Sequence, residues 1–181
     1  MSPQPFPVRA ADLRDVPALL ALVHSAYRGE SSRVGWTTEA DLLDGPRLDA
    51  DLLLAELTDP ATTVLLTADE HGPAGCATVT DRGDGLFYFG LFAVRPGAQG
   101  RGIGSALLDA AEAHGRVRGG TTMEMTVISV RADLIAWYAR RGYRGTGELR
   151  PFPYGDERYG LPRRDDLEFS VLRKQLAASV Q

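Results

Sequence analysis

The chain has 181 residues, of which 44% are hydrophobic and 24% are charged, and its formal net charge is −4. This length and apolar content suit a single domain over 1–181 with a flexible tail at 1–7, and the slight acidic excess excludes a broad nucleic-acid surface. The single cysteine, Cys76, excludes an internal disulfide, and the chain lacks a run of about 18 apolar residues. We therefore expect a cytoplasmic protein without a membrane contact.

The first third of the chain is expected to be mainly helical. A short strand at Val8 to Ala11 precedes apolar residues at helical spacing, which predict an amphipathic helix that begins after an aspartate and runs through Tyr27 to Gly29. Two further helical stretches are expected, one from Thr37 or Thr38 through Leu43 and one over Leu48 to Leu57.

From Ala61 the pattern changes to strands. Three β-branched and apolar runs, separated by turn residues, predict an antiparallel meander over Thr62 to Ala68, Pro73 to Thr80 and Leu86 to Val94. A loop rich in glycine then leads into a helical pattern that starts at Ile103 and ends at Gly119-Gly120.

The last third predicts a crossover and a closing pair of strands. The strand Thr121 to Val130 is expected to lie parallel to Leu86 to Val94 through a right-handed connection, and a short helix covers Arg131 to Arg141. Two more strands are expected at Tyr143 to Leu149 and Leu167 to Arg173, with a long loop between them. This order predicts an α+β fold, with a mixed, mostly antiparallel central sheet of about seven strands flanked by helices.

The loop between the third meander strand and the next helix carries the strongest functional signal. Gly100, Gly102 and Gly104 leave several successive backbone N–H groups able to point at one anion, and the positive end of the following helix lies behind them. The expected ligand is a phosphate.

Around this loop stand Val94-x-Pro96 and then Gln99-x-x-Gly102-x-Gly104, and this pattern resembles the GCN5-related N-acetyltransferase (GNAT) family. The resemblance runs from about Val8 to Arg173 and implies the GNAT-like acyl-CoA N-acyltransferase fold, with the pyrophosphate of acetyl-CoA on the loop. It also implies that a distorted strand at Leu86 to Val94 binds the pantetheine arm through its backbone. The positions that it assigns to the cofactor are Phe92, Ala93, Val94, Gln99, Gly100, Arg101, Gly102, Ile103, Gly104, Ser105 and Arg131.

The segment Val130 to Tyr143 resembles the closing helix of the family, whose tyrosine protonates the coenzyme A thiolate. Tyr138 matches that tyrosine, so the resemblance implies that it is the general acid. The sequence departs from the family at Arg131, where an asparagine commonly touches the cofactor. It departs again at Gly90, where many members carry a glutamate that deprotonates the amine.

The general base is therefore unassigned. An alkylamine with a pKa near about 10.4 is protonated at neutral pH, so its proton needs an acceptor. Candidates are a water chain or one of four carboxylates: Glu30, Glu39, Asp81 and Glu124. By analogy with the family, the wall of the acceptor site is expected to include Arg33, Trp36, Tyr88, Phe152, Tyr154 and Tyr159.

The leading hypothesis is an N-acetyltransferase that uses acetyl-CoA and acts on a small-molecule or peptide amine. Analogy with the family also suggests a homodimer. The missing glutamate at Gly90 keeps open a non-catalytic acyl-CoA-binding module. Binding of S-adenosylmethionine or a dinucleotide is a third reading, because Glu124 follows the glycines by about 20 residues; too few elements remain after Glu124 for that fold. The scattered histidines show no metal-ligand spacing, so no metal is predicted.

Overall fold

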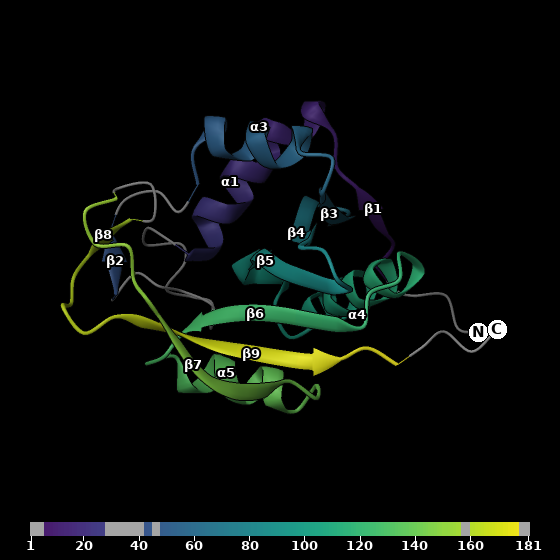
Figure 1. Ribbon diagram of the computed structural model, residues 1–181. Coiled ribbons are helices and arrows are strands. Elements are labelled where there is room, and N and C mark those ends of the chain that lie inside the picture. Colours follow the sequence, from purple (N-terminus) through teal and green to yellow (C-terminus); the bar gives the residue numbers. More distant parts are fainter. Residues whose placement is uncertain (1–5, 28–41, 45–47, 157–159, 178–181) are drawn as a thin grey trace.

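The protein is described by a computed structural model over residues 6–27, 42–44, 48–156 and 160–177. A central sheet has the strand order β1-β3-β4-β5-β6-β9-β7, and all neighbouring pairs are antiparallel except β5 and β6 (Figure 1). The strands of this sheet are β1 Val8–Ala10, β3 Thr62–Asp69, β4 Gly72–Asp81, β5 Leu86–Val94, β6 Thr122–Ile128, β7 Arg144–Pro151 and β9 Glu168–Gln175. The expected α+β fold and its mostly antiparallel sheet are confirmed.

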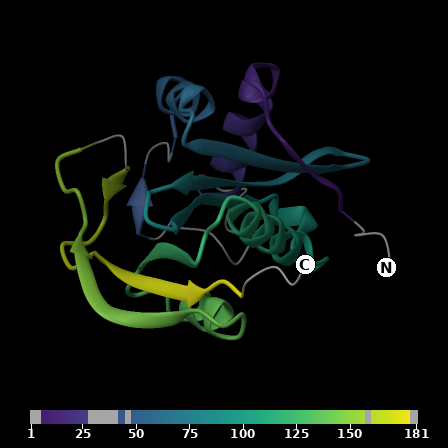
Figure 2. The same cartoon turned by 45° about the vertical axis from the view of Figure 1, so that its right-hand side comes forward.

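Helices cover both faces of the sheet. They are α1 Val16–Tyr27, α3 Ala50–Thr58, α4 Ile103–Val117 and α5 Ala132–Ala139. The helices α1 and α3 pack on one face, while α4 and α5 contribute to a separate core cluster on the other face (Figures 1 and 2). Within the described ranges, no helix combines the length and apolar character needed to span a membrane.

The alternation of side chains along the strands explains the two core clusters. In β5, Phe92 and Val94 belong to the cluster under α4, whereas Leu91 and Ala93 pack with the residues of α1 and α3. Successive residues of a strand point to opposite faces, so an aromatic-rich strand that is buried on both sides reads as a nearly continuous apolar run. The most apolar strand of the sequence is accordingly central in the sheet.

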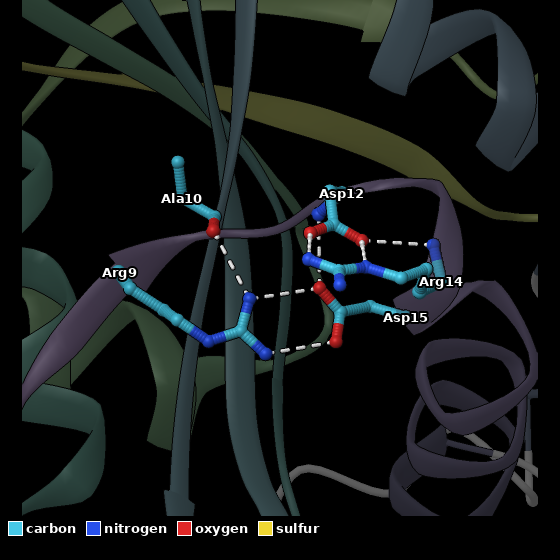
Figure 3. A network of polar contacts seen from close by, with 5 residues as sticks. All are labelled: Arg9, Ala10, Asp12, Arg14 and Asp15. Atoms are coloured by element: carbon cyan, nitrogen blue, oxygen red, sulfur yellow. Dashed lines mark hydrogen bonds and ion pairs between the residues drawn. The ribbon is translucent and has the colours of Figure 1, made fainter.

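The connection from β1 into α1 is held by two aspartates and two arginines (Figure 3). The Asp12 side chain accepts a hydrogen bond from the N–H of Arg14, and Asp15 accepts one from the N–H of Asp12, which forms a capping box before the helix. Arg9 of β1 donates two hydrogen bonds of 2.8 Å to Asp15. The hydrogen bonds from Arg14 lower the pKa of Asp12 to about 2. An aspartate therefore marks the start of the helical region, as the sequence predicts.

One predicted helix is wrong at its described end. Leu43 and Asp44 form strand β2, Leu43–Asp44, which pairs with β8, Leu161–Pro162, inside the segment expected to be a loop. The neighbouring Leu42 is buried against Ile128, Phe152 and Leu167, so pairing and burial between distant segments override local helical spacing. Residues 28–41, which include the rest of this prediction and the expected end at Gly29, lie outside the described residues.

Candidate functional site

The sheet opens between β5 and β6. The two strands pair over only three positions, from Leu86 opposite Thr122 to Tyr88 opposite Glu124, whereas β6 pairs with β9 along its whole length. On its other side, β5 has a bulge that sets both Leu91 and Phe92 against the single residue Ala77, and Leu91 has a φ of +46°. A bulge bends its strand and turns it away from its neighbour. The distortion expected in this strand is therefore present, and the main chain of β5 beyond Tyr88 faces the opening.

A cavity of about 330 Å³ occupies this opening. On the face of α1 and α3 its walls include Thr78, Tyr88 and Thr126; on the face of α4 and α5 they include Phe92 and Tyr138. The Tyr88 hydroxyl lies 2.7 Å from the Thr126 Oγ1 and so bridges the two strands where they separate. The cavity thus reaches from one face of the sheet to the other through the gap between β5 and β6.

The glycine loop offers a row of backbone donors. Gly100 and Gly102 have φ values of +79° and +88°, a conformation that favours glycine, and a Cβ at either position would meet no atom within 4 Å. Among the described residues, no group accepts a hydrogen bond from the backbone N–H groups between Gly100 and Ser105. These donors lie at the N-terminus of α4, a ready-made anion site. Gly104 serves packing instead, because a Cβ there would lie 3.0 Å from the Phe92 ring.

A second cavity of about 310 Å³ lies over this loop. It is lined by Val94, Gln99, Gly100, Gly102, Ile103, Gly104, Ser105, Trp137 and Arg141. The Arg141 guanidinium lies 3.5 Å from the centre of the Trp137 ring and donates a hydrogen bond of 2.7 Å to the Ser105 Oγ. Burial lowers the pKa of Arg141. A positive charge is therefore held beside the row of N–H donors, which suits a polyanionic ligand such as a diphosphate.

The base of the loop is fixed by an ion-pair cluster. The Asp69 carboxylate accepts hydrogen bonds from Arg95 and from Arg101, at 2.7 and 3.1 Å to its Oδ2. The hydrogen bond from Arg95 is the largest cause that lowers the pKa of Asp69 to about 2. The Arg101 side chain thus points to the turn between β3 and β4.

Tyr138 lies beside the first cavity, and its chain neighbour Trp137 lies beside the second. Tyr138 is 4% exposed, its side chain lines the first cavity, and its ring lies 5.1 Å from the Trp137 ring and 6.3 Å from the Phe92 ring. Trp137, the preceding residue on α5, lines the second cavity. The hydroxyl-bearing side chain of Tyr138 thus lies at the point where a chain that enters over the glycine loop would reach the opening in the sheet.

The remaining predicted site residues are spread over three locations. Arg131 and Tyr88 line the first cavity, and Arg131 also pairs with Asp133 at 3.2 Å. Phe152 is buried against Phe169, the exposed Tyr154 donates a hydrogen bond to the carbonyl of Arg164, and neither residue lines either of these two cavities. The predicted residues Arg33, Trp36 and Tyr159 lie outside the described residues.

None of the four carboxylates predicted as candidate bases is seen to line one of the two cavities. Both oxygens of Glu124 are bound, one by Arg150 at 3.0 Å and the other by Arg173 at 2.7 Å, and Asp81 accepts the N–H of Gly83 in a turn. Neither lines a cavity. Glu30 and Glu39 lie outside the described residues.

Sequence reasoning missed Trp137, Arg141 and Glu56. The first two both lie close to Tyr138 in the chain, which was an available signal: Trp137 precedes it, and Arg141 follows it by three residues, about one helical turn. Glu56 lies on α3 and lines the first cavity. No local pattern distinguishes it from a solvated acid, because only tertiary packing brings α3 to the opening.

The comparisons with known proteins agree with this geometry. The model of the acetyltransferase (GNAT) family matches residues 22–143. The ribosomal-protein-S18-alanine N-acetyltransferase from Escherichia coli superposes with a TM-score of 0.71 at 16% identity, over 97% of each chain. The ribosomal-protein-alanine N-acetyltransferase from Brucella melitensis gives 0.68 at 21% identity, over 94% of this chain and 99% of the other.

A third structure, yncA from Salmonella typhimurium with its cofactor acetyl-CoA, has a TM-score of 0.68 at 21% identity, over 98% of each chain. At these identities the likeness to solved structures shows the fold. No match was found among curated protein sequences.

Proposed function

The chain belongs to the acetyltransferase (GNAT) family, and we propose that it transfers an acetyl group from acetyl-CoA to a primary amine by direct attack, with Tyr138 as the general acid. Family membership makes it an acetyl-CoA-dependent acyltransferase. The observation that carries the finer proposal is the succession of two adjoining cavities, one over a row of backbone donors and the other in a split sheet beside Tyr138.

The residues over the glycine loop fit the diphosphate of acetyl-CoA. The N–H groups between Gly100 and Ser105 are donors without an acceptor in the described chain, and Arg141 adds a positive charge beside them. The main chain from Phe92 to Val94 faces the gap left by β6 and would bind the amide groups of the pantetheine arm as an added strand. Bound acetyl-CoA supplies the acetyl thioester, and these residues orient it toward the first cavity.

Tyr138 is proposed to donate its hydroxyl proton to the sulfur as the carbon–sulfur bond breaks. Its packing against Phe92, Trp137 and Tyr143 fixes the position of the ring beside the first cavity. A positioned proton donor typically contributes about 10²- to 10⁴-fold in rate.

The acceptor is proposed to be an amine of a small molecule or of a peptide. Two of the similar structures are named for alanine acetylation on ribosomal proteins, which is an N-acetylation of a protein acceptor. The opening on the face of α1 and α3 presents Thr78, Thr80 and Tyr88, polar groups that suit an amine-bearing chain. A homodimer stays a prediction, as does the cytoplasmic location.

The test is release of thiol from acetyl-CoA in the presence of a panel of primary amines and peptides. We expect turnover with at least one acceptor and calorimetric binding of coenzyme A. Binding of coenzyme A without turnover on any acceptor would favour a non-catalytic acyl-CoA-binding module. Binding of S-adenosylmethionine without binding of coenzyme A would overturn the proposal.

A further inference from the structure

The strand beside the reaction site, Leu86–Val94, carries no acidic side chain, and the space around its glycine is tight. At Gly90, a Cβ would lie 3.1 Å from the Thr78 Oγ1 and 3.1 Å from the Tyr88 ring, tighter than an ordinary contact. Tyr88 is itself fixed by its hydroxyl contact with Thr126 and by the Arg82 guanidinium, 4.6 Å from the ring centre. A side-chain base for the amine would therefore come from another element.

Glu56 enters the same cavity from α3. Among the described residues that line the cavity it is the only carboxylate, and it lies on the face of the sheet opposite to Tyr138. Figure 1 shows α3 and α5 on opposite sides of β5 and β6. An acid and a base on the two sides of the opening can act on the two ends of one acyl transfer, one at the sulfur and the other at the nitrogen.

The surroundings of Glu56 are those of a base rather than of a structural ion pair. Within the described chain, no hydrogen bond or ion pair holds its carboxylate, in contrast to the doubly bound Glu124. Burial raises the pKa of Glu56, helped by the charge of Asp59 and opposed by Arg82. A half-buried carboxylate with a raised pKa is a stronger base than a solvated one.

We propose that Glu56 is the general base that takes the proton from the acceptor ammonium, an inference that rests on the proposed acetyl transfer. The carboxylate accepts one proton from the nitrogen, whose lone pair then forms the bond to the carbonyl carbon. The carbon–sulfur bond breaks, and the sulfur takes the proton of the Tyr138 hydroxyl. The second proton of the nitrogen returns to Tyr138 through solvent, and Glu56 releases its own proton to solvent.

The experiment compares Glu56→Gln with the wild type on two kinds of acceptor. Hydroxylamine is largely unprotonated at neutral pH and needs no base, whereas simple alkylamines such as butylamine are protonated and do. We expect Glu56→Gln to lower kcat/KM for alkylamines by about 10²- to 10⁴-fold and to leave transfer to hydroxylamine within about threefold. Glu56→Asp should restore part of the alkylamine rate.

Controls separate a chemical role from a structural one. Asp51→Asn removes an exposed acid from the same helix and should change neither rate. The melting temperature of Glu56→Gln should not fall, because the change removes a half-buried charge that has no ion-pair partner among the described residues. An equal loss on both acceptors, or wild-type transfer to hydroxylamine but to no alkylamine, would overturn the proposal for Glu56. A wild type that binds no acetyl-CoA and transfers to neither acceptor would instead refute the proposed function itself.

Discussion

At Tyr138, the replacement by phenylalanine tests proton donation, because it removes only the hydroxyl from a buried ring. We expect kcat to fall by about 10²- to 10⁴-fold while the affinity for acetyl-CoA, measured by calorimetry, changes little. Tyr143→Phe is the matched control: its ring lies 5.9 Å from Tyr138, but its hydroxyl is bound to Glu112. Equal loss of kcat in both variants would contradict a specific role for Tyr138.

Gly102 tests the anion site through both shape and charge. A glutamate at φ +88° is strained by about 1–2 kcal/mol, and its carboxylate would lie among the donors that the diphosphate needs. We expect Gly102→Glu to lower the affinity for coenzyme A at least about 100-fold in calorimetry. Gly147→Glu has a similar φ of +83° in open space on β7, so it should carry the strain without the loss of affinity.

Arg141 tests whether a side-chain charge adds to the backbone donors. A charge-assisted hydrogen bond contributes about 1.5–3 kcal/mol, so Arg141→Gln should weaken binding of acetyl-CoA by about tenfold or more. The exposed neighbour Arg140, changed to glutamine, gives the control with the same loss of charge. If the two variants bind equally well, Arg141 only braces Trp137 and Ser105.

At this scale the sequence predicted the start of a helix at Ile103 after a glycine loop, which are locally encoded features. The glycines and the helix that starts at Ile103 are adjacent in the chain, so a short motif describes the whole donor row. Glu56 lies on a helix more than 80 residues from Tyr138, and its approach to the cavity depends on how α3 packs. Local spacing in a single sequence cannot predict a contact between residues so far apart in the chain.

At the scale of elements, α4 is attached to the end of the sheet through a buried carboxylate. Glu112 is 3% exposed and accepts hydrogen bonds from Lys174 of β9, from Arg116 and from the Tyr143 hydroxyl. Burial, together with the charge of Glu112, raises the pKa of Tyr143. The tyrosine thus stays protonated and keeps its hydrogen bond through the neutral range.

Glu112→Gln should therefore destabilise the fold without touching the cavities. Two partly exposed cations lose their counter-charge, and a buried donor left without a good acceptor costs about 1–3 kcal/mol, so we expect the free energy of unfolding to fall by about 2 kcal/mol. Urea denaturation measures this change. Asp109→Asn, an exposed acid on the same helix, should change it by less than about 0.5 kcal/mol. A similar effect of both changes would show that only the net charge of α4 matters.

Elements with a clear period were predicted from the sequence, and the shortest ones were not. The meander of β3, β4 and β5 follows β-branched or apolar runs of eight to ten residues, long enough to show the pattern of a strand. The strands β2 and β8 have two residues each, and they exist because distant segments meet. A two-residue strand is too short to show an alternating pattern. The helical spacing of the apolar residues around Leu43 therefore led to the wrong prediction of a helix there.

At the scale of the whole molecule, the split sheet has a thermodynamic consequence. The edge of β5 beyond Tyr88 and the donors of the glycine loop belong to different elements, and one elongated ligand that binds both would tie β5, α4 and α5 together. A ligand that binds only the folded chain raises its stability by mass action. The sequence predicts the ligand, whereas the gain in stability on binding depends on an opening that only the assembled sheet provides.

Acetyl-CoA should accordingly raise the melting temperature of the wild type. At about 100 times the dissociation constant the gain is about 2.7 kcal/mol, which for a chain of this size corresponds to roughly 5–10 °C in a thermal shift measurement. Gly102→Glu should show almost none of this shift at the same concentration, because its donors are blocked. Tyr138→Phe should keep it, because the phenol acts on the sulfur and not on the diphosphate. A shift that persists in Gly102→Glu would place the cofactor away from the glycine loop. The proposed placement of acetyl-CoA across the two cavities would then be wrong.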